Sequence, residues 1–236
     1  MEVRYSTRPQ DWATLVLAGA TAVFVVATLR GRHLWAGAAG FIIVVGVIAA
    51  RHWSRTNPAP MPFGMRWVLF LLPHGARYLE RMLRPRSGER ILEIGPGVGH
   101  HAFHIATLLR PHGSLEVVDI QQPTLDAILS RAVADGITNI VPIRADAQSL
   151  PYANATFDAA YLSAVLGEIP DQRAALRELH RVLKVDGRLV IAEVMLDPDY
   201  VRLSTLRAEA ESTGLVLEEK VGPVFAYVAR FRARQS

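Results

Sequence analysis

The chain has 236 residues, enough for one domain of ordinary size and an additional segment, and its formal net charge is +4. Half of the residues are hydrophobic, 20% are charged and the mean hydropathy is +0.19, which is more apolar than a soluble domain needs. The absence of cysteine excludes disulfide bonds and thiolate metal sites. The positive charge is almost all arginine, which codon composition explains better than a nucleic-acid partner.

Two uncharged apolar runs near the N-terminus account for this excess. They span residues 12–29 and 34–50, and the short basic segment Arg30–His33 separates them. At a rise of about 1.5 Å per residue, each run would extend about 26 Å as a helix, which matches the core of a bilayer. A signal peptide would not be followed at once by a second apolar run, and a buried hairpin would show a polar face. We therefore predict a transmembrane helical hairpin within residues 1–55.

The arginines around this hairpin predict its orientation. Five flank the two runs and two lie in the tight loop between them: Arg4, Arg8, Arg51, Arg55 and Arg66, against Arg30 and Arg32. Because cytoplasmic segments carry an excess of basic residues, both termini should be cytoplasmic. The sequence thus predicts a multi-pass protein of the cell membrane, with the lipid bilayer as a partner. Small residues on both runs allow close helix packing, which would serve a homodimer as well as a monomer.

A proline-rich connector follows the hairpin. Residues 56–62 contain three prolines and cannot form a regular helix, so we place the domain boundary there. The apolar segment 63–72 is too short to span a bilayer. It would lie on the membrane surface, cover the active site as a lid, or pack as a core helix on a sheet. With a short amphipathic helix at 76–84, residues 56–84 form this connector, and residues 85–236 form the main domain.

The segment Arg90–Leu109 predicts a strand, a tight turn and a helix. Glu93 lies near the end of the apolar strand, and three glycines follow at alternating positions, Gly95, Gly97 and Gly99. Glycines let the backbone turn sharply and leave room for a ligand, so this turn can hold a nucleotide-like cofactor. A dinucleotide-binding turn would need its third glycine at position 100, where a histidine stands. A structural turn with no ligand is the alternative.

The acidic-x-Gly-x-Gly-x-Gly pattern resembles motif I of the class I S-adenosylmethionine-dependent methyltransferases. The resemblance implies that Glu93 orients the turn and, through it, the methionine part of S-adenosylmethionine. Gly95, Gly97 and Gly99 would then hold this cofactor, and residues 85–236 would be a methyltransferase domain.

Two further segments agree with this resemblance. The strand 115–120 ends with Asp119 and Ile120, and in this fold a carboxylate there accepts hydrogen bonds from the ribose hydroxyls. After a helix at 123–134 and a strand at 139–144, Asp146 and Ala147 resemble the stretch beside the adenine, with the aspartate on the exocyclic amine. Asp146 would otherwise cap the short turn before Leu150.

The second half of the chain is similar to the ubiquinone/menaquinone-type branch of these methyltransferases. Residues 150–163 show the pattern L-P, then T-F-D and an apolar strand, and residues 169–191 show the helix, turn and fifth strand of that branch. The usual K-P-G-G turn is K-V-D-G here, at Lys184–Gly187, which is a departure in a structural turn.

A helix at 200–213 and two strands, at 215–221 and 224–231, close the domain. The resemblance covers about residues 76–232. It implies an α/β fold, a Rossmann-like seven-stranded methyltransferase sheet with a C-terminal antiparallel strand pair, next to the N-terminal hairpin.

Methyl transfer from a sulfonium needs an acceptor held near the methyl carbon and water kept out, and a base only when the acceptor must lose a proton. Ser163 and Glu168, just beyond the fourth strand, are candidates for catalytic contact, and so are His74 and Tyr78. Ser163 is also expected to contact the cofactor. Each of the four has an ordinary structural alternative; Glu168, for example, would otherwise cap the following helix or lie in solvent.

Three histidines after the glycine-rich turn have partial metal-ligand spacing: His100, His101 and His104. No carboxylate accompanies them on the helix, so we expect no metal there.

The expected function is a membrane-anchored S-adenosylmethionine-dependent methyltransferase with a cytoplasmic catalytic domain. Its acceptor would be a lipid headgroup amine or an isoprenoid quinone, because both are found where a hairpin anchor would hold the enzyme. A small hydrophobic thiol or phenol is an alternative acceptor. A non-catalytic, cofactor-binding membrane scaffold and a nicotinamide oxidoreductase are alternatives of other classes.

Overall fold

The computed structural model describes residues 40, 41, 45, 74–195, 197 and 199–234. The predicted helices at 12–29 and 34–50, the proline-rich connector and the segment 63–72 lie outside the described residues, apart from Gly40, Phe41 and Val45, which are helical. Within the part of the chain that the structure describes, no helix is both long enough and apolar enough to cross a membrane. One compact unit begins at His74, and the described strands belong to it.

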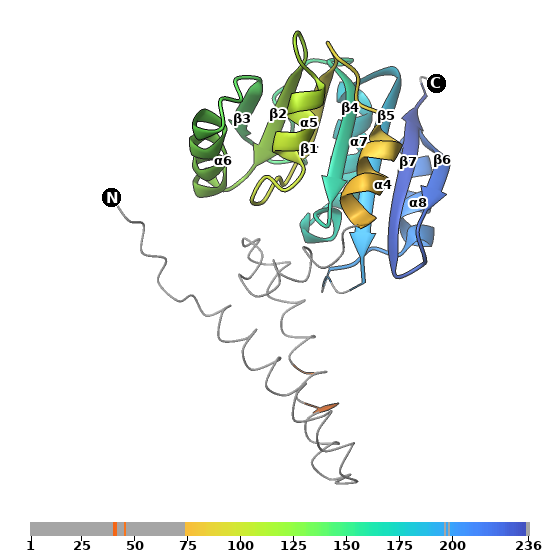
Figure 1. Ribbon diagram of the computed structural model, residues 1–236. Helices are drawn as coiled ribbons and strands as arrows, with labels where there is room; N and C mark the ends of the chain where they lie inside the picture. Colours follow the sequence, from red (N-terminus) through yellow and green to blue (C-terminus); the bar gives the residue numbers. More distant parts are fainter. Residues whose placement is uncertain (1–39, 42–44, 46–73, 196, 198, 235–236) are drawn as a thin grey trace. The chain divides into compact units, whose positions relative to one another are not determined.

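A seven-stranded sheet forms the centre of the described unit (Figure 1). The strand order is β3-β2-β1-β4-β5-β7-β6, and the strands are β1 (Arg90–Ile94), β2 (Ser114–Asp119), β3 (Ile140–Arg144), β4 (Phe157–Ser163), β5 (Leu183–Val194), β6 (Leu215–Val221) and β7 (Ala226–Ala233). Strands β1 to β5 are parallel, whereas β7 lies between β5 and β6 and runs antiparallel to both. The predicted seven-stranded sheet with a closing antiparallel pair is confirmed.

Helices cover both faces of this sheet. One face carries α4 (His74–Leu83), α5 (Ala102–Leu108) and α6 (Gln122–Ala134), and the other carries α7 (Gln172–Val182) and α8 (Leu203–Glu211). A short 3-10 helix, η1 (Leu166–Glu168), follows β4. Figure 1 shows α4 and α5 in front of the sheet and α7 and α8 behind it. Because helices bury the central parallel strands on both faces, those strands are nearly continuous apolar runs in the sequence.

The sequence of α7 shows how these helices form. Asp171 precedes the helix, and its carboxylate accepts a hydrogen bond from the Ala174 backbone N–H at 2.8 Å, which satisfies one of the free donors of the first turn. Leu176, Leu179 and Val182 then recur three residues apart and are fully buried against the sheet. The predicted apolar stripe of this helix is therefore the face that packs.

Strand β5 is longer than the sequence predicts, because it begins at Leu183, before the predicted turn at Lys184–Gly187. Phe157 of β4 pairs with Leu183, and the next paired residue of β4, Ala159, is opposite Arg188, so Lys184–Gly187 bulge out of the ladder. Asp186 takes the left-handed backbone conformation there, with φ of 59°. Position 187 needs a glycine for a steric reason and not for its backbone conformation, because a Cβ there would lie 2.8 Å from the Lys184 carbonyl oxygen.

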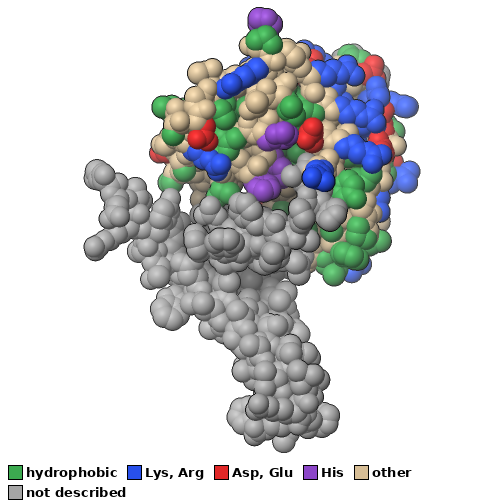
Figure 2. Space-filling view, in the orientation of Figure 1, with side chains coloured by type: hydrophobic (Ala, Val, Ile, Leu, Met, Phe, Trp, Pro, Cys, Tyr) green, Lys and Arg blue, Asp and Glu red, His purple; other side chains and the backbone are tan. Residues whose placement is uncertain are grey.

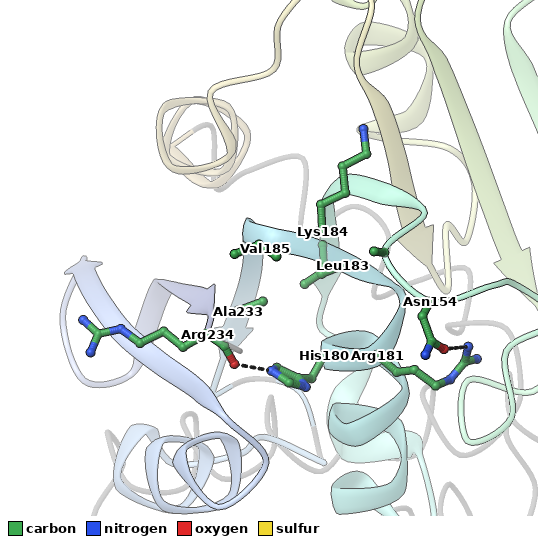
Figure 3. A pocket seen from close by; sticks show the side chains of 9 residues that line it. Asn154, His180, Arg181, Leu183, Lys184, Val185, Ala233 and Arg234 are labelled. Carbon is green, nitrogen blue, oxygen red and sulfur yellow. Dashed lines mark hydrogen bonds between the residues drawn. The ribbon is translucent and has the colours of Figure 1, made fainter. Parts of the chain in front are cut away.

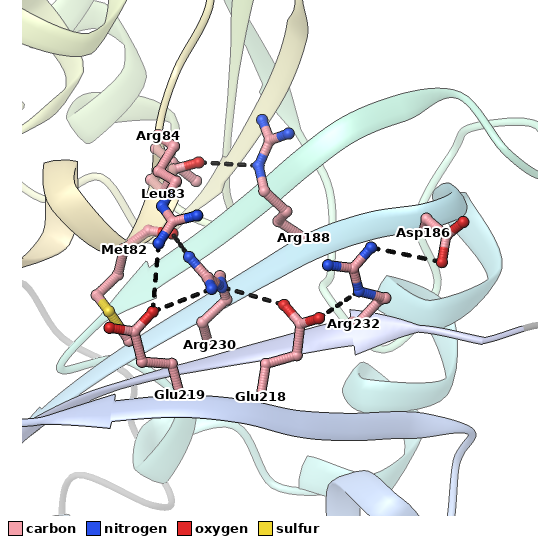
Figure 4. Close-up of polar contacts among 9 residues, drawn as sticks. All are labelled: Met82, Leu83, Arg84, Asp186, Arg188, Glu218, Glu219, Arg230 and Arg232. Carbon is pink, nitrogen blue, oxygen red and sulfur yellow. Dashed lines mark hydrogen bonds and ion pairs between the residues drawn. The ribbon is translucent and has the colours of Figure 1, made fainter.

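A network of ion pairs ties the end of α4 to the sheet (Figure 4). The Arg188 Nε donates to the Leu83 carbonyl oxygen at 2.9 Å, and Arg230 donates to the Met82 carbonyl oxygen at 3.4 Å. Arg230 is buried, and its charge is balanced by Glu218 at 3.1 Å and Glu219 at 3.0 Å on β6. Guanidinium groups thus satisfy the free carbonyls at the helix C-terminus, which fixes the direction in which α4 crosses the sheet.

Candidate active site

The parallel strands β1 to β5 all end at one edge of the sheet, which we call the cofactor edge. There β1 lies between β2 and β4, and the chain leaves β1 and β4 toward helices on opposite faces. Such a reversal opens a crevice beyond the strand ends, the usual ligand position in open α/β sheets. The structure brings the glycine-rich turn, Asp119 and Ser163 together at this edge, as the sequence predicts.

The three glycines of the turn have positive φ angles: 64° at Gly95, 54° at Gly97 and 75° at Gly99. Side-chain-bearing residues rarely adopt this conformation, which explains the alternating glycines. Gly95 has a second constraint, because a Cβ on it would lie 2.6 Å from the Val165 side chain. A Cβ on Gly97 would meet nothing within 4 Å. The backbone at Gly97 therefore borders open space, which fits a bound cofactor.

Glu93 is 3% exposed and lies next to Tyr161, its partner in the β1–β4 register. Burial raises the pKa of Glu93 to about 8, and the approaching Tyr161 hydroxyl offsets only part of this rise. Neither the Glu93 Oε2 nor the Tyr161 hydroxyl has a partner with good hydrogen-bond geometry in the described structure. A buried carboxylate oxygen with spare acceptor capacity, directly under the turn, fits a cationic or N–H donor such as the methionine ammonium of the expected cofactor.

Asp119 ends β2, and Ile120 follows it with an exposed side chain. The Asp119 Oδ1 accepts a hydrogen bond from the Gln121 backbone N–H at 2.8 Å, which holds the carboxylate at the cofactor edge. Burial raises the pKa of Asp119, and the backbone N–H groups of Gln121 and Ile120 partly offset the rise. This position and orientation are compatible with the predicted contact to the ribose hydroxyls.

Asp146 and Ala147 follow β3 at the same edge. The Asp146 carboxylate accepts from the Gln148 backbone N–H at 2.8 Å and from the Gln148 side-chain amide, so it caps the short turn before Leu150. The capping alternative describes these contacts, and the predicted contact with adenine stays a prediction. The Ala147 side chain packs into the hydrophobic core, which leaves its backbone as the part that can face a ligand.

Glu168, on η1, is the centre of an acidic cluster beside the turn. Burial, and then the negative charges of Asp197, Asp199 and Asp119, raise the pKa of Glu168 to about 8. Glu193, near the end of β5, also has a pKa of about 8, mainly because it is buried. Since the charge of Asp119 acts on Glu168, the predicted cofactor contact and the predicted catalytic carboxyl share one site.

The loop after β5 packs against the segment that carries Glu168. A Cβ on Gly167 would lie 1.7 Å from the Asp199 carbonyl oxygen, so the two backbones are in direct contact. The sequence predicts only a lid or a linker at residues 197–199, so Asp197 and Asp199 were not recognised as site residues. Glu193, which lies in β5, was also missed. The signal that would have found Glu193 is an acidic residue inside an otherwise buried, apolar strand.

The remaining candidates lie on α4. His74 is its first residue, and its side chain lies outside the described part of the structure. Tyr78 packs against the core cluster under α4 and α5, on the sheet face to which Glu93 and Tyr161 also point. Ser163 instead ends β4, directly before the segment that carries Glu168.

The three histidines stay close together, with the His100 and His101 rings 4.8 Å apart in a T-shaped contact, but they have different environments. Burial lowers the pKa of His101 to about 4, and His104 pairs with Glu80 of α4, with 2.9 Å between the Nε2 and the carboxylate. Among the described residues, no group of His, Asp and Glu side chains has an arrangement that could hold a metal ion.

A pocket of about 260 Å³ lies at the opposite edge of the sheet, between the end of α7, the start of β5 and the end of β7 (Figure 3). Several of the polar groups that line it already have partners within the protein. His180 Nε2 bonds to the Arg234 carbonyl oxygen at 2.8 Å, and Arg181 pairs with Glu178 at 2.7 Å. This pocket is therefore part of the scaffold, and the candidate site stays at the cofactor edge.

Comparison with known proteins agrees with this geometry. Residues 73–203 match the sequence profile of the ubiE/COQ5 methyltransferase family. The ubiquinone/menaquinone biosynthesis C-methyltransferase UbiE of Coxiella burnetii is 38% identical over 111 residues, which are 47% of this chain and 44% of that protein. The protein of the same name from Pseudomonas putida is 38% identical over 112 residues, 46% of this chain and 43% of that protein.

The chain thus spans less than half the length of these relatives. Among solved structures, a SAM dependent methyltransferase from Aquifex aeolicus superposes with a TM-score of 0.62 and 15% identity over 67% of this chain and 89% of that chain, a likeness that concerns the fold. The glycine-rich turn, the strand order and a family match that covers more than half of the sequence lead to one conclusion: this chain belongs to the ubiE/COQ5 methyltransferase family, whose cofactor is S-adenosylmethionine.

Proposed function

We propose that this protein is a membrane-anchored methyltransferase that acts on an acceptor dissolved in the bilayer, and that the acceptor is an isoprenoid quinone precursor. The observation that carries the proposal is the carboxyl of Glu168. It has a pKa of about 8 and lies at the same edge as the cofactor turn, close enough to Asp119 to respond to its charge. The names of the UbiE relatives and the apolar runs at 12–29 and 34–50 support the quinone and the membrane location.

S-adenosylmethionine supplies an electrophilic methyl group. When bound, it would give this methyl group to the acceptor while its sulfur keeps the electron pair of the broken carbon–sulfur bond, and the acceptor would have to lose a proton. Glu168 takes this proton, because a base with a pKa near the working pH combines a useful ionised fraction with sufficient basicity. Glu93 and Asp119 hold the two ends of the cofactor, and the loop on Gly167 excludes water.

A lipid headgroup amine is the second candidate acceptor. The acidic cluster of Glu168, Glu193, Asp197 and Asp199 favours it. The charges of Asp197 and Asp199 add to the effect of burial in raising the pKa values of Glu168 and Glu193, and a cationic ammonium among these carboxyls would be stabilised. Both acceptors partition into the membrane and would be recovered in the same lipid extract. One labelling experiment can therefore test for both.

The full-length chain in nanodiscs is incubated with methyl-labelled S-adenosylmethionine and a total lipid extract of its host. Label should enter the organic phase, and chromatography then distinguishes a quinone from a headgroup. The Asp119→Ala variant should lose the signal, whereas Asp135→Ala, which removes an exposed carboxylate at the far end of α6, should retain it. Cofactor binding without any label in lipid would contradict the proposal.

The role of Glu168 is tested by the pH profile of the same reaction. With a pKa of about 8, the ionised fraction of its carboxyl rises about tenfold between pH 7 and pH 9, and the rate should follow. The Glu168→Gln variant should be slow and should lack this dependence. An unchanged profile in the variant would exclude Glu168 as the base.

A further inference from the structure

Three large apolar side chains are exposed together at the cofactor edge: Met195 (61% exposed), Val224 (74%) and Phe225 (57%). Met195 follows β5, and Val224 and Phe225 form the turn between β6 and β7. The Met195 backbone N–H donates to the Phe225 carbonyl oxygen at 2.8 Å, which joins the two segments. In the space-filling view, hydrophobic side chains gather where β6 ends and β7 begins (Figure 2). An exposed cluster of this kind needs a partner to cover it.

The residues around this patch are cationic and aromatic. Lys220 and Arg202 are exposed beside it, and the Lys220 ammonium donates to the Gly222 carbonyl oxygen in the same turn. The Tyr200 hydroxyl donates to the Val224 carbonyl oxygen. In the adjoining loop, Asp199 is buried and Asp197 is half-buried, so both are less exposed than Lys220 and Arg202. Surfaces that insert into the headgroup region of an anionic bilayer combine exposed apolar side chains with neighbouring basic and tyrosine side chains, and this patch has that combination.

The path of the chain agrees with a membrane at this edge. Helix α4 ends beside Arg188, near the start of the regular part of β5. Since α4 runs about 15 Å along the sheet, it begins at His74 near the opposite end of β5, where the patch lies. Figure 1 shows α4 crossing the sheet in this direction. The described unit therefore begins, at His74, at the cofactor edge.

We propose that Met195, Val224 and Phe225 form a membrane-insertion patch that seats the cofactor edge on the lipid surface. This inference rests on the membrane location in the proposed function and is independent of the reaction assigned there. The patch lies at the same edge as Glu168 and the glycine-rich turn, so its insertion would open the site toward acceptors in the bilayer rather than toward water.

The absence of cysteine makes the test direct, because one introduced cysteine can be labelled uniquely. Val224→Cys and Phe225→Cys carry an environment-sensitive fluorophore in the full-length chain. The matched controls are Val133→Cys (72% exposed) and Val185→Cys (54%), apolar positions of similar exposure at the opposite edge. Each protein is studied in detergent and in vesicles of phosphatidylcholine and phosphatidylglycerol that contain spin-labelled lipid.

In vesicles, the probes at 224 and 225 should shift to shorter emission wavelengths and be quenched at least about twofold by the spin-labelled lipid, while both control probes behave as they do in detergent. Equal quenching at all four positions, or water-exposed emission at 224 and 225, would overturn the inference. Probes at 224 and 225 that emit at short wavelength in vesicles but are not quenched by the spin-labelled lipid would also overturn it and would indicate that another part of the chain or a second copy covers the patch.

The same preparations separate this inference from the proposed function. If the protein does not float with vesicles but transfers methyl groups in detergent, the membrane-insertion patch is refuted and the proposed methyl transfer is retained. If the probes at 224 and 225 are quenched by lipid but the protein transfers no methyl group, the membrane-insertion patch is retained and the proposed reaction is refuted.

Discussion

The buried carboxyl of Glu93 should make the protein less stable as the pH rises, and Glu93→Gln should remove this dependence. Burial raises the pKa of Glu93 from 4.5 to about 8, so the folded state keeps a proton that the unfolded chain releases above pH 4.5. Keeping it costs about 1.4 kcal/mol per pH unit, hence about 3 kcal/mol at pH 7 and less than about 1 kcal/mol at pH 5. The cost at pH 7 depends little on the exact folded-state pKa, provided that it exceeds 7.

The glutamine variant has a neutral side chain of similar shape. Its amide carries its own desolvation cost, but this cost does not change with pH. The free energy of unfolding of the variant relative to the natural protein should therefore increase by about 2–3 kcal/mol from pH 5 to pH 7, or about 5 to 10 °C in midpoint temperature. Thermal unfolding of the full-length chain in detergent, followed by circular dichroism at both pH values, measures this difference. A relative stability that stays constant between the two pH values would refute the argument that Glu93 is protonated in the folded state.

Three further outcomes concern the turn and the acceptor side. Gly95→Ala should cost about 2–5 kcal/mol of stability, from its positive φ and a clash with a valine side chain, whereas Gly97→Ala should cost about 1–2 kcal/mol. Both variants should bind the cofactor more weakly by calorimetry, and wild-type affinity in both would show that the turn holds no cofactor. Gly167→Ala should displace the loop after β5 and lower turnover while cofactor affinity is kept; a loss of affinity alone would contradict this. Asp197→Asn should lower the pKa of Glu168 and move the rising part of the pH–rate profile to lower pH, and an unmoved profile would refute that coupling.

The fold and the positions of the glycine-rich turn and of Asp119 could be predicted because their signals are local. The spacing of Gly95, Gly97 and Gly99 follows from backbone conformations within one turn, and Asp119 was recognisable as the last polar residue of an apolar strand. The closing strand pair was recognisable from two apolar runs around Gly222 and Pro223. Element ends shifted by a few residues, and β5 was underestimated because its bulge at Lys184–Gly187 resembles a turn.

The acceptor side could not be predicted in the same way, because its chemistry depends on distant neighbours. The sequence places Glu93 and Tyr161 on separate strands, and only the register of β1 and β4 sets them side by side. The pKa of Glu168 depends on burial and on the charge of Asp197, which looks like part of a linker until the loop is packed against Gly167.

The sequence by itself determined the family, the order of the strands along the chain and the residues of the cofactor turn, since each of these is encoded in short patterns of polarity and glycine. Only the tertiary structure decided which carboxyls hold a proton near neutral pH and where α4 enters the domain. It also decided that Met195 lies beside Phe225. The physical reason is that burial, proximity of charges and exposed apolar area are properties of surfaces, and those surfaces exist only once distant segments have packed together.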